Sequence, residues 1–78
     1  MNIKIREMEC GSKAVITGYE KTGTAYRQKL LSMGLTTGTE IELIKVAPFG
    51  DPVEIKIRDY KLSLRKEEAD VLLLKEVN

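Results

Sequence analysis

The chain contains no histidine and a single cysteine, Cys10, and this shortage limits how so small a fold can be stabilised. One thiol cannot close a disulfide within the chain, and a structural zinc site needs four Cys or His ligands. A domain of 78 residues buries only about 60% of the surface that its unfolded chain exposes. The core must therefore come from tight packing of regular elements alone. A lone cysteine is also typical of a reducing compartment.

The charges of the chain nearly balance, with 13 lysines and arginines against 12 aspartates and glutamates. This argues against nucleic acid as the main partner, because phosphate binding usually needs a basic excess. The longest apolar run, over residues 71–74, is far shorter than the roughly 20 residues that cross a bilayer. Lys4, Arg6 and Glu7 stand where a signal peptide would be apolar. We expect one domain over residues 1–78, located in the cytosol, outside the membrane and without a cofactor.

Alternating apolar and polar residues predict short strands along most of the chain. Residues 3–5 form a short strand or an extended arm. The strands over residues 53–58 and 60–65 form an antiparallel hairpin with one solvent-exposed face. The strand over residues 71–77 is apolar on both sides at its start, so we expect it to be central or to close a barrel. The predicted strands are residues 3–5, 13–19, 40–47, 53–58, 60–65 and 71–77.

The strand over residues 40–47 changes its apolar face part-way along. Ile41 and Leu43 alternate with acidic residues, whereas Ile44 and Val46 have the opposite parity. A flat strand with this pattern would turn core side chains into water. A β-bulge or a strong bend between Leu43 and Ile44 resolves the conflict, and such bends let a strand curve around a small barrel.

One helix is predicted, over residues 25–33. Thr24 is the expected N-cap, and Gly34 can take the left-handed conformation that ends a helix. Leu35 would then pack back on Leu30, as in a Schellman ending. One apolar stripe at helical spacing comprises Tyr26, Leu30 and Met33.

A stiff loop is predicted where two prolines flank a glycine. Pro48 suits the second position of a type I turn and Gly50 the fourth. Asp51 precedes Pro52, which favours extended backbone and the start of a strand. Phe49 would lie near the tip of this loop.

Short strands, tight turns and a bent strand favour a mainly β fold, a small SH3-like β-barrel that is closed or partly open. The helix over residues 25–33 would be an insertion in this barrel. A further turn is expected at Gly38, and residues 66–70 form a polar helical turn like the one before the last strand of SH3-like barrels.

Three segments in order resemble the FeoA family, the small partner of the bacterial FeoB ferrous-iron transporter. They are residues 26–34 with Gly38, residues 46–53 and residues 62–66. The resemblance extends from about residue 11 to residue 77. It implies an SH3-like fold, a cytosolic location and a role in Fe²⁺ uptake beside the transporter.

The residues themselves offer little chemistry. Iron sites usually combine imidazole with carboxylate, and Cys10 has no histidine to activate it as a nucleophile. We interpret Glu67, Glu68 and Asp70 as a solvated turn. We expect neither an enzyme nor a metal site.

Protein binding is the function that we favour. Leu31 lies about 100° around the helix from Leu30, so one sheet cannot bury both. A groove between the helix and the proline loop, with Arg27 at its rim, would suit an apolar segment of the transporter's cytosolic part. Docking there would bias the transporter's conformational or nucleotide cycle. The expected partner-binding residues are Tyr26, Arg27, Leu30, Leu31, Met33, Pro48 and Phe49.

The alternative is a small nucleic-acid-binding barrel with a basic hairpin face. Small barrels bind RNA with basic side chains and stacked aromatics, but the parity of Tyr60 predicts an inward ring. The basic residues of this alternative are Lys56, Arg58, Lys61 and Arg65.

Overall fold

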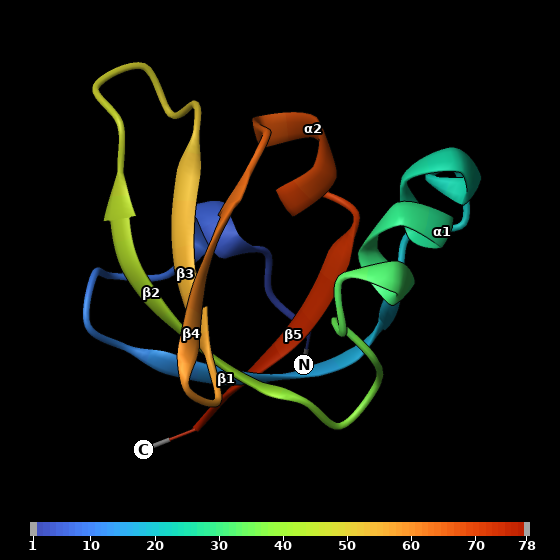
Figure 1. The fold of residues 1–78 in the computed structure, drawn as a ribbon, viewed down its shortest axis with the longest axis horizontal. Helices are drawn as coiled ribbons and strands as arrows, with labels where there is room; N and C mark the ends of the chain where they lie inside the picture. Colours follow the sequence, from blue (N-terminus) through green and yellow to red (C-terminus); the bar gives the residue numbers. More distant parts are fainter. Residues whose placement is uncertain (1, 78) are drawn as a thin grey trace.

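Five antiparallel strands form one curved sheet in the computed structural model, which describes residues 2–77 (Figure 1). The strand order is β4-β3-β2-β1-β5, so the sheet is open between β4 and β5. The elements are η1 (Ile5–Glu7), β1 (Lys13–Tyr19), α1 (Thr24–Ser32), β2 (Glu40–Val46), β3 (Val53–Ile57), β4 (Tyr60–Leu64), α2 (Lys66–Ala69) and β5 (Leu72–Val77). The predicted hairpin corresponds to β3 and β4, and the predicted polar turn is the single helical turn α2.

The last strand, β5, lies at an edge of the sheet, so its predicted central or barrel-closing position is wrong. It pairs with β1 on one side. On its other side Ile3 forms an isolated bridge with Leu74, with backbone N–H to O distances of 2.7 and 2.9 Å. The N-terminal arm thus covers part of the edge of β5. After this bridge the arm turns into η1 instead of continuing as a strand.

The change of apolar face in β2 is a β-bulge, as predicted. Leu43 pairs with Ile55 and Lys45 pairs with Glu54, which leaves Ile44 as the extra residue. The bulge allows β2 to bend while Leu43 stays in the core.

Helix α1 begins one residue earlier than predicted, with Gly23 as its N-cap. The backbone N–H of Arg27 donates to the Gly23 carbonyl at 2.8 Å, which makes Gly23 the acceptor of the first helical bond. The Thr24 hydroxyl instead faces the carbonyl of Lys21, at 3.5 Å. The predicted Thr24 cap is therefore wrong.

The predicted Schellman ending of α1 is confirmed. Gly34 has a φ of +89°, and its N–H donates to the Leu31 carbonyl at 3.0 Å. The N–H of Leu35 donates to the Leu30 carbonyl, also at 3.0 Å. This geometry returns Leu35 to the core, where it is fully buried beside Leu30.

The core lies inside the curve of the sheet and draws on every strand and both helices. Ile5 and Met8 of the N-terminal arm join it from outside the sheet. The buried apolar residues are Ile5, Met8, Ala14, Ile16, Leu30, Leu35, Ile41, Leu43, Val53, Ile55, Ile57, Leu64, Ala69, Val71, Leu72 and Leu74.

Candidate protein-docking surfaces

Helix α1 presents apolar side chains to solvent as well as to the core. Leu30 is fully buried, whereas Leu31 is 40% exposed, as its place on the helix predicts. Tyr26 is 41% exposed and Met33 is half-buried, so only one residue of the predicted stripe lies wholly in the core. Leu30 is the one buried residue of α1, so the rest of the helix surface remains exposed.

Arg27 lies over the ring of Tyr19 rather than at the rim of a groove. Its guanidinium carbon is 5.3 Å from the ring centroid, a cation–π distance. The Tyr19 hydroxyl donates to the Leu35 carbonyl and thereby holds the ring in place. Arg27 therefore adds a positioned positive charge to the same helix that exposes Leu31.

The β2–β3 loop is the stiff turn that the sequence predicts. The N–H of Gly50 donates to the Ala47 carbonyl at 2.8 Å, which places Pro48 at the second position of the turn. Gly50 has a φ of +80°, and Phe49 at the tip is 93% exposed.

Two bonds hold the base of this loop. The N–H of Ala47 donates to the carbonyl of Pro52 at 3.1 Å, and Asp51 Oδ1 accepts the N–H of Lys66 at 3.1 Å. The second bond ties the loop to the start of α2. The peptide bond between Asp51 and Pro52 is cis, and Gly38 has a φ of +93° in the turn before β2.

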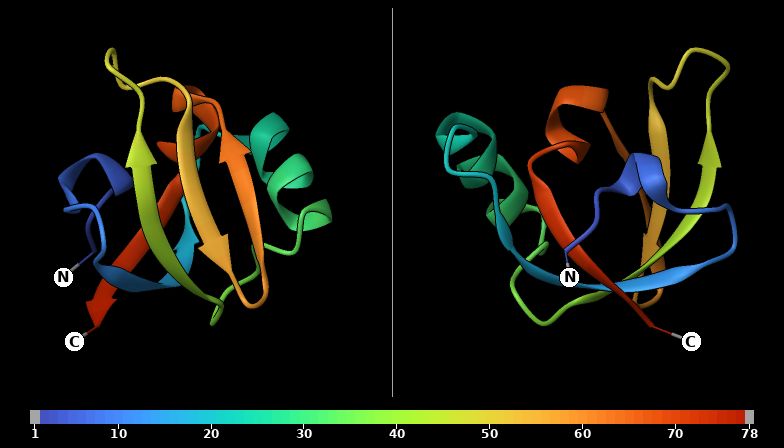
Figure 2. Two further views of the ribbon diagram at one scale, coloured as in Figure 1. Left: turned by 60° about the vertical axis from the view of Figure 1, so that its left-hand side comes forward. Right: turned by 180° about the vertical axis from the view of Figure 1, so that it is seen from behind.

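The helix and the loop lie on opposite sides of the molecule, so the predicted groove between them does not form. Figures 1 and 2 show α1 at one side and the β2–β3 loop at the other, with α2 between them. The periodicity of each segment shows that it has an exposed apolar side chain, but not that the two share a face. Arg27 and Leu31, one turn apart on α1, therefore belong to one surface, and Pro48 and Phe49 to another. Tyr26 lies about 140° around the helix from Leu31, on the flank that faces Glu67 and Val71.

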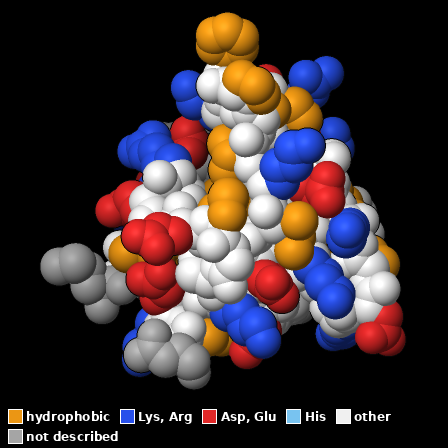
Figure 3. Space-filling view, turned by 90° about the vertical axis from the view of Figure 1, so that its left-hand side faces the viewer, with side chains coloured by type: hydrophobic (Ala, Val, Ile, Leu, Met, Phe, Trp, Pro, Cys, Tyr) orange, Lys and Arg blue, Asp and Glu red, His pale blue; other side chains and the backbone are white. Residues whose placement is uncertain are grey.

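An apolar groove does adjoin the loop, but its other wall is the N-terminal arm. The groove has a volume of about 330 Å³. Figure 3 shows hydrophobic side chains along this face, from the tip of the loop downward. The lining residues are Ile5, Arg6, Met8, Val46, Gly50, Val53, Lys66, Ala69 and Asp70.

This groove was not predicted from the sequence, because no role was expected for the N-terminal arm. Ile5 and Met8 are three residues apart, which places two side chains on one face of a helical turn. That spacing was the available signal. Their partners Val53 and Ala69 come from distant parts of the chain.

The basic residues of the alternative function are exposed, but acids pair with two of them. Lys61 Nζ is 3.9 Å from a carboxylate oxygen of Glu54, and Arg65 is 3.8 Å from that of Asp51. All four basic residues of this alternative are exposed, namely Lys56, Arg58, Lys61 and Arg65.

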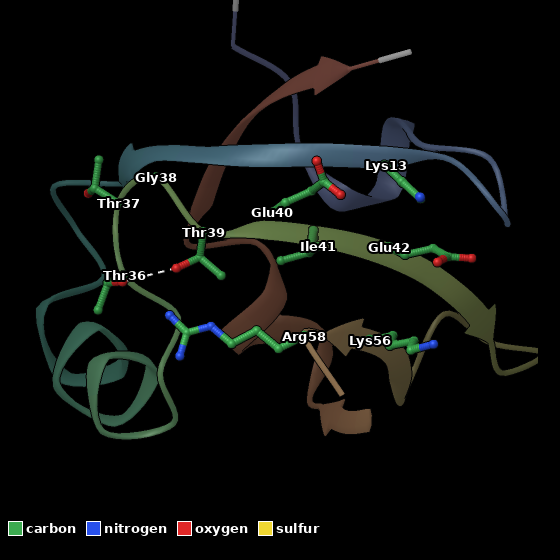
Figure 4. A pocket seen from close by; sticks show the side chains of 10 residues that line it. All are labelled: Lys13, Thr36, Thr37, Gly38, Thr39, Glu40, Ile41, Glu42, Lys56 and Arg58. Atoms are coloured by element: carbon green, nitrogen blue, oxygen red, sulfur yellow. Dashed lines mark hydrogen bonds between the residues drawn. The ribbon is translucent and has the colours of Figure 1, made fainter. Parts of the chain in front are cut away.

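A broad hollow of about 660 Å³ lies beside Lys56 and Arg58 (Figure 4). Glu40 and Glu42 of β2 line the same hollow. With Lys13 of β1, three basic and two acidic side chains line the hollow, and this near balance does not favour a phosphate backbone.

Tyr60 does not point into the core, contrary to its predicted parity. It is the first residue of β4 and is 44% exposed. Its hydroxyl donates to the Met33 carbonyl at 3.2 Å, so the ring lies against the end of α1. The sheet ends at this point, and the side chain reaches the helix instead of the interior.

Glu68 is buried, so the interpretation of the acidic residues as a solvated turn is wrong for this member. It is 4% exposed, and its carboxylate lies 2.5 Å from Lys29 Nζ of α1. It also accepts the backbone N–H of Arg65 at 2.8 Å. Burial alone would raise the pKa of Glu68, but these bonds and the nearby positive charges outweigh it and hold the pKa below its ordinary value.

We expect Glu68→Gln to flatten the acid side of the stability profile. A carboxyl with a lowered folded-state pKa contributes stability above its unfolded pKa of about 4.3 and loses it as pH falls through the folded value. Because Lys29 is largely exposed, we expect the variant to be only about 1 kcal/mol less stable than wild type at pH 7. This difference in the free energy of unfolding should shrink below about pH 4. Urea unfolding between these pH values measures it, and exposed Glu67→Gln is the control. Wild-type and Glu68→Gln profiles that stay parallel would contradict the assignment.

Two general features of residues 2–77 bear on the kind of site. None of their helices is long and apolar enough to cross a bilayer. Among these residues, no group of three or more His, Cys, Asp and Glu side chains is arranged so that it could hold a metal ion.

A family model, the FeoA domain, matches residues 3–76. The chain belongs to the FeoA family. A relative from Porphyromonas gingivalis (strain ATCC BAA-308 / W83) is a fusion of Fe(2+) transport protein A with the Fe(2+) transporter FeoB. It is 39% identical over 67 residues, which are 86% of this FeoA chain and 8% of the fusion protein. The chain thus spans a small part of that relative's length.

Solved structures of FeoA proteins have the same fold. The solution structure of a FeoA-like protein from Clostridium acetobutylicum has a TM-score of 0.87 at 38% identity, and covers 99% of this chain and 88% of that one. The crystal structure of an iron uptake regulatory protein (FeoA) has a TM-score of 0.83 at 27% identity, and covers 99% of both chains. The mainly β, SH3-like fold and the family resemblance predicted from the sequence are confirmed.

Proposed function

We propose that this chain is a non-catalytic accessory of a FeoB-type ferrous-iron transporter and acts in the cytosol by docking on the transporter's cytosolic part. One observation carries the proposal: a domain 39% identical to this chain is joined to an Fe(2+) transporter in a single polypeptide. Covalent linkage keeps two partners at a high effective concentration, which benefits an interaction that is weak between separate chains.

The outer surface of α1 is the proposed docking site. Leu31 is 40% exposed, and Arg27, one turn before it, is oriented over the Tyr19 ring. Aromatic residues and arginine beside an aliphatic residue are typical of the energetically important centre of an interface. Leu30 and Met33 support the site from below rather than contacting the partner.

Two contacts fix the position of α1 relative to the rest of the domain. The ion pair between Lys29 and Glu68 joins α1 to α2, and the Tyr60 hydroxyl caps the Met33 carbonyl. A docked helix of this kind favours whichever transporter conformation matches its position, and thereby biases the conformational or nucleotide cycle.

We expect Leu31→Asp to weaken binding to the transporter's cytosolic part at least tenfold, because a charge would replace an apolar contact at the centre of the interface. Isothermal titration calorimetry with the purified transporter measures the change in affinity. Because Leu31 is 40% exposed, the variant should fold normally.

A variant with Lys56, Arg58 and Lys61 reversed to glutamate is the matched control and should bind the transporter as wild type does. If this variant loses binding while Leu31→Asp keeps it, the proposed surface is wrong. Retention of RNA by wild type that only the charge-reversed variant loses would instead support the basic face.

A further inference from the structure

Phe49 is the most exposed of the large hydrophobic side chains in residues 2–77, at 93%. Single exposed apolar residues are common on protein surfaces and need no explanation by themselves. This ring is different because its loop is stiff. The turn bond from Gly50 to Ala47 and the bond from Lys66 to Asp51 keep the ring away from its own domain.

The apolar groove at the base of the same loop offers the complementary shape. Its walls include Ile5, Met8, Val53 and Ala69, each less than one-tenth exposed. Val46, 39% exposed, belongs to its lining and precedes the loop. An apolar cavity of about 150 Å³ suffices for a benzene molecule. The groove, at about 330 Å³, therefore has room for a phenyl ring.

We propose that this face is an interface between two copies of the chain, in which Phe49 of each copy enters the groove of the other. A protruding ring and a groove side by side on one face are compatible with a two-fold symmetric dimer, since each copy then gives and receives the same contact. Figure 3 shows that the protruding tip and the apolar side chains share one face.

The chemistry of the loop suits its insertion into the apolar groove of a second copy. Residues 46–50 carry no charged side chain, so their insertion desolvates no ion. Pro48 already restricts the loop, which lowers the entropy lost on binding. Three charged residues line the groove. Arg6 and Asp70 form an ion pair at 3.4 Å, and Lys66 is exposed, so all three can stay in water at the rim.

The size of the contact predicts a weak dimer. A buried aromatic ring contributes about 150–250 Å², so two rings and their grooves bury on the order of 800 Å². Stable interfaces bury at least about 1,200 Å². We therefore expect rapid exchange and a dissociation constant on the order of 10⁻⁴ M.

Sedimentation velocity over about a hundredfold range around that concentration tests the proposal. Wild type should shift from monomer to dimer, and Phe49→Asp should associate at least tenfold more weakly. Phe49→Trp, which keeps an aromatic ring, should still dimerise. Leu31→Asp introduces the same charge on the opposite side and should dimerise as wild type does.

Val46→Lys tests the groove separately, because it places a charge on the wall while the ring remains. We expect it to lose dimerisation as Phe49→Asp does. On dilution of wild type, amide NMR shifts should change at Ile5, Met8 and Ala69. A wild type that stays monomeric, a Phe49→Asp variant that dimerises normally, a Val46→Lys variant that still dimerises, or shifts confined to α1 would each overturn the proposal.

Discussion

Leu30→Ala should lower the free energy of unfolding by about 2–5 kcal/mol, the largest loss that we expect from one substitution in α1. Leu30 is fully buried and is the only residue of α1 in the core cluster. Its truncation removes the apolar anchor of the helix and leaves a cavity. In a domain of this size each kcal/mol lowers the melting temperature by about 4–8 °C, so thermal unfolding monitored by circular dichroism should show a drop of about 8 °C or more.

Leu31→Ala is the matched control, because it makes the same change one position along the helix. Leu31 is 40% exposed, so its loss should cost about 0.5 kcal/mol or less. Equal losses at the two positions would mean that the helix is not anchored by Leu30. Together, the pair also separates stability from docking, since only Leu31 belongs to the proposed contact with the transporter.

Gly23→Ser should destabilise the protein by about 1–3 kcal/mol, although serine is normally a favourable N-cap residue. A Cβ atom at position 23 would lie 2.4 Å from Cγ2 and 2.8 Å from Cγ1 of Val71. Gly23 has a φ of −97°, so the backbone itself accepts a side chain. The expected loss therefore comes from the close approach of α1 to the start of β5, and urea unfolding measures it.

Removal of the obstructing side chain should cancel much of this effect. In a Val71→Ala background, serine at position 23 should cost markedly less than in wild type, which a double-mutant cycle detects as coupling. Gly18→Ser is the control, because the nearest atom to its Cβ would be Cδ1 of Leu73, at an ordinary 3.9 Å. Additive effects at positions 23 and 71 would show that the contact is not the cause.

The candidate surfaces were predictable in part. The angular position of Leu31 and the turn around Phe49 correctly predicted two exposed apolar side chains. The sequence could not show that these lie on opposite sides of the molecule. It also missed the burial of Glu68, because the partner Lys29 is 39 residues away in the chain.

Most helices and strands of this protein follow from local sequence patterns. The five strands of the sheet, the bulge at Ile44, the ending at Gly34 and the turn at Pro48 were predicted correctly or to within a residue or two, whereas the helical turn η1 was not predicted. Each depends on residues that are neighbours in the chain, whose spacing and hydrogen bonds act locally. This local information also carried the family resemblance.

Local patterns do not specify which segments cover one another in the folded chain. Ile3 pairs with Leu74 and covers the edge of β5, and Ile5 joins Ala69 in one apolar groove. Periodicity shows that a side of a strand or helix is apolar, but hydrophobic attraction is non-directional and does not specify which distant segment will bury it. That choice depends on the packing of the whole chain, and it separated the surface of α1 from that of the β2–β3 loop.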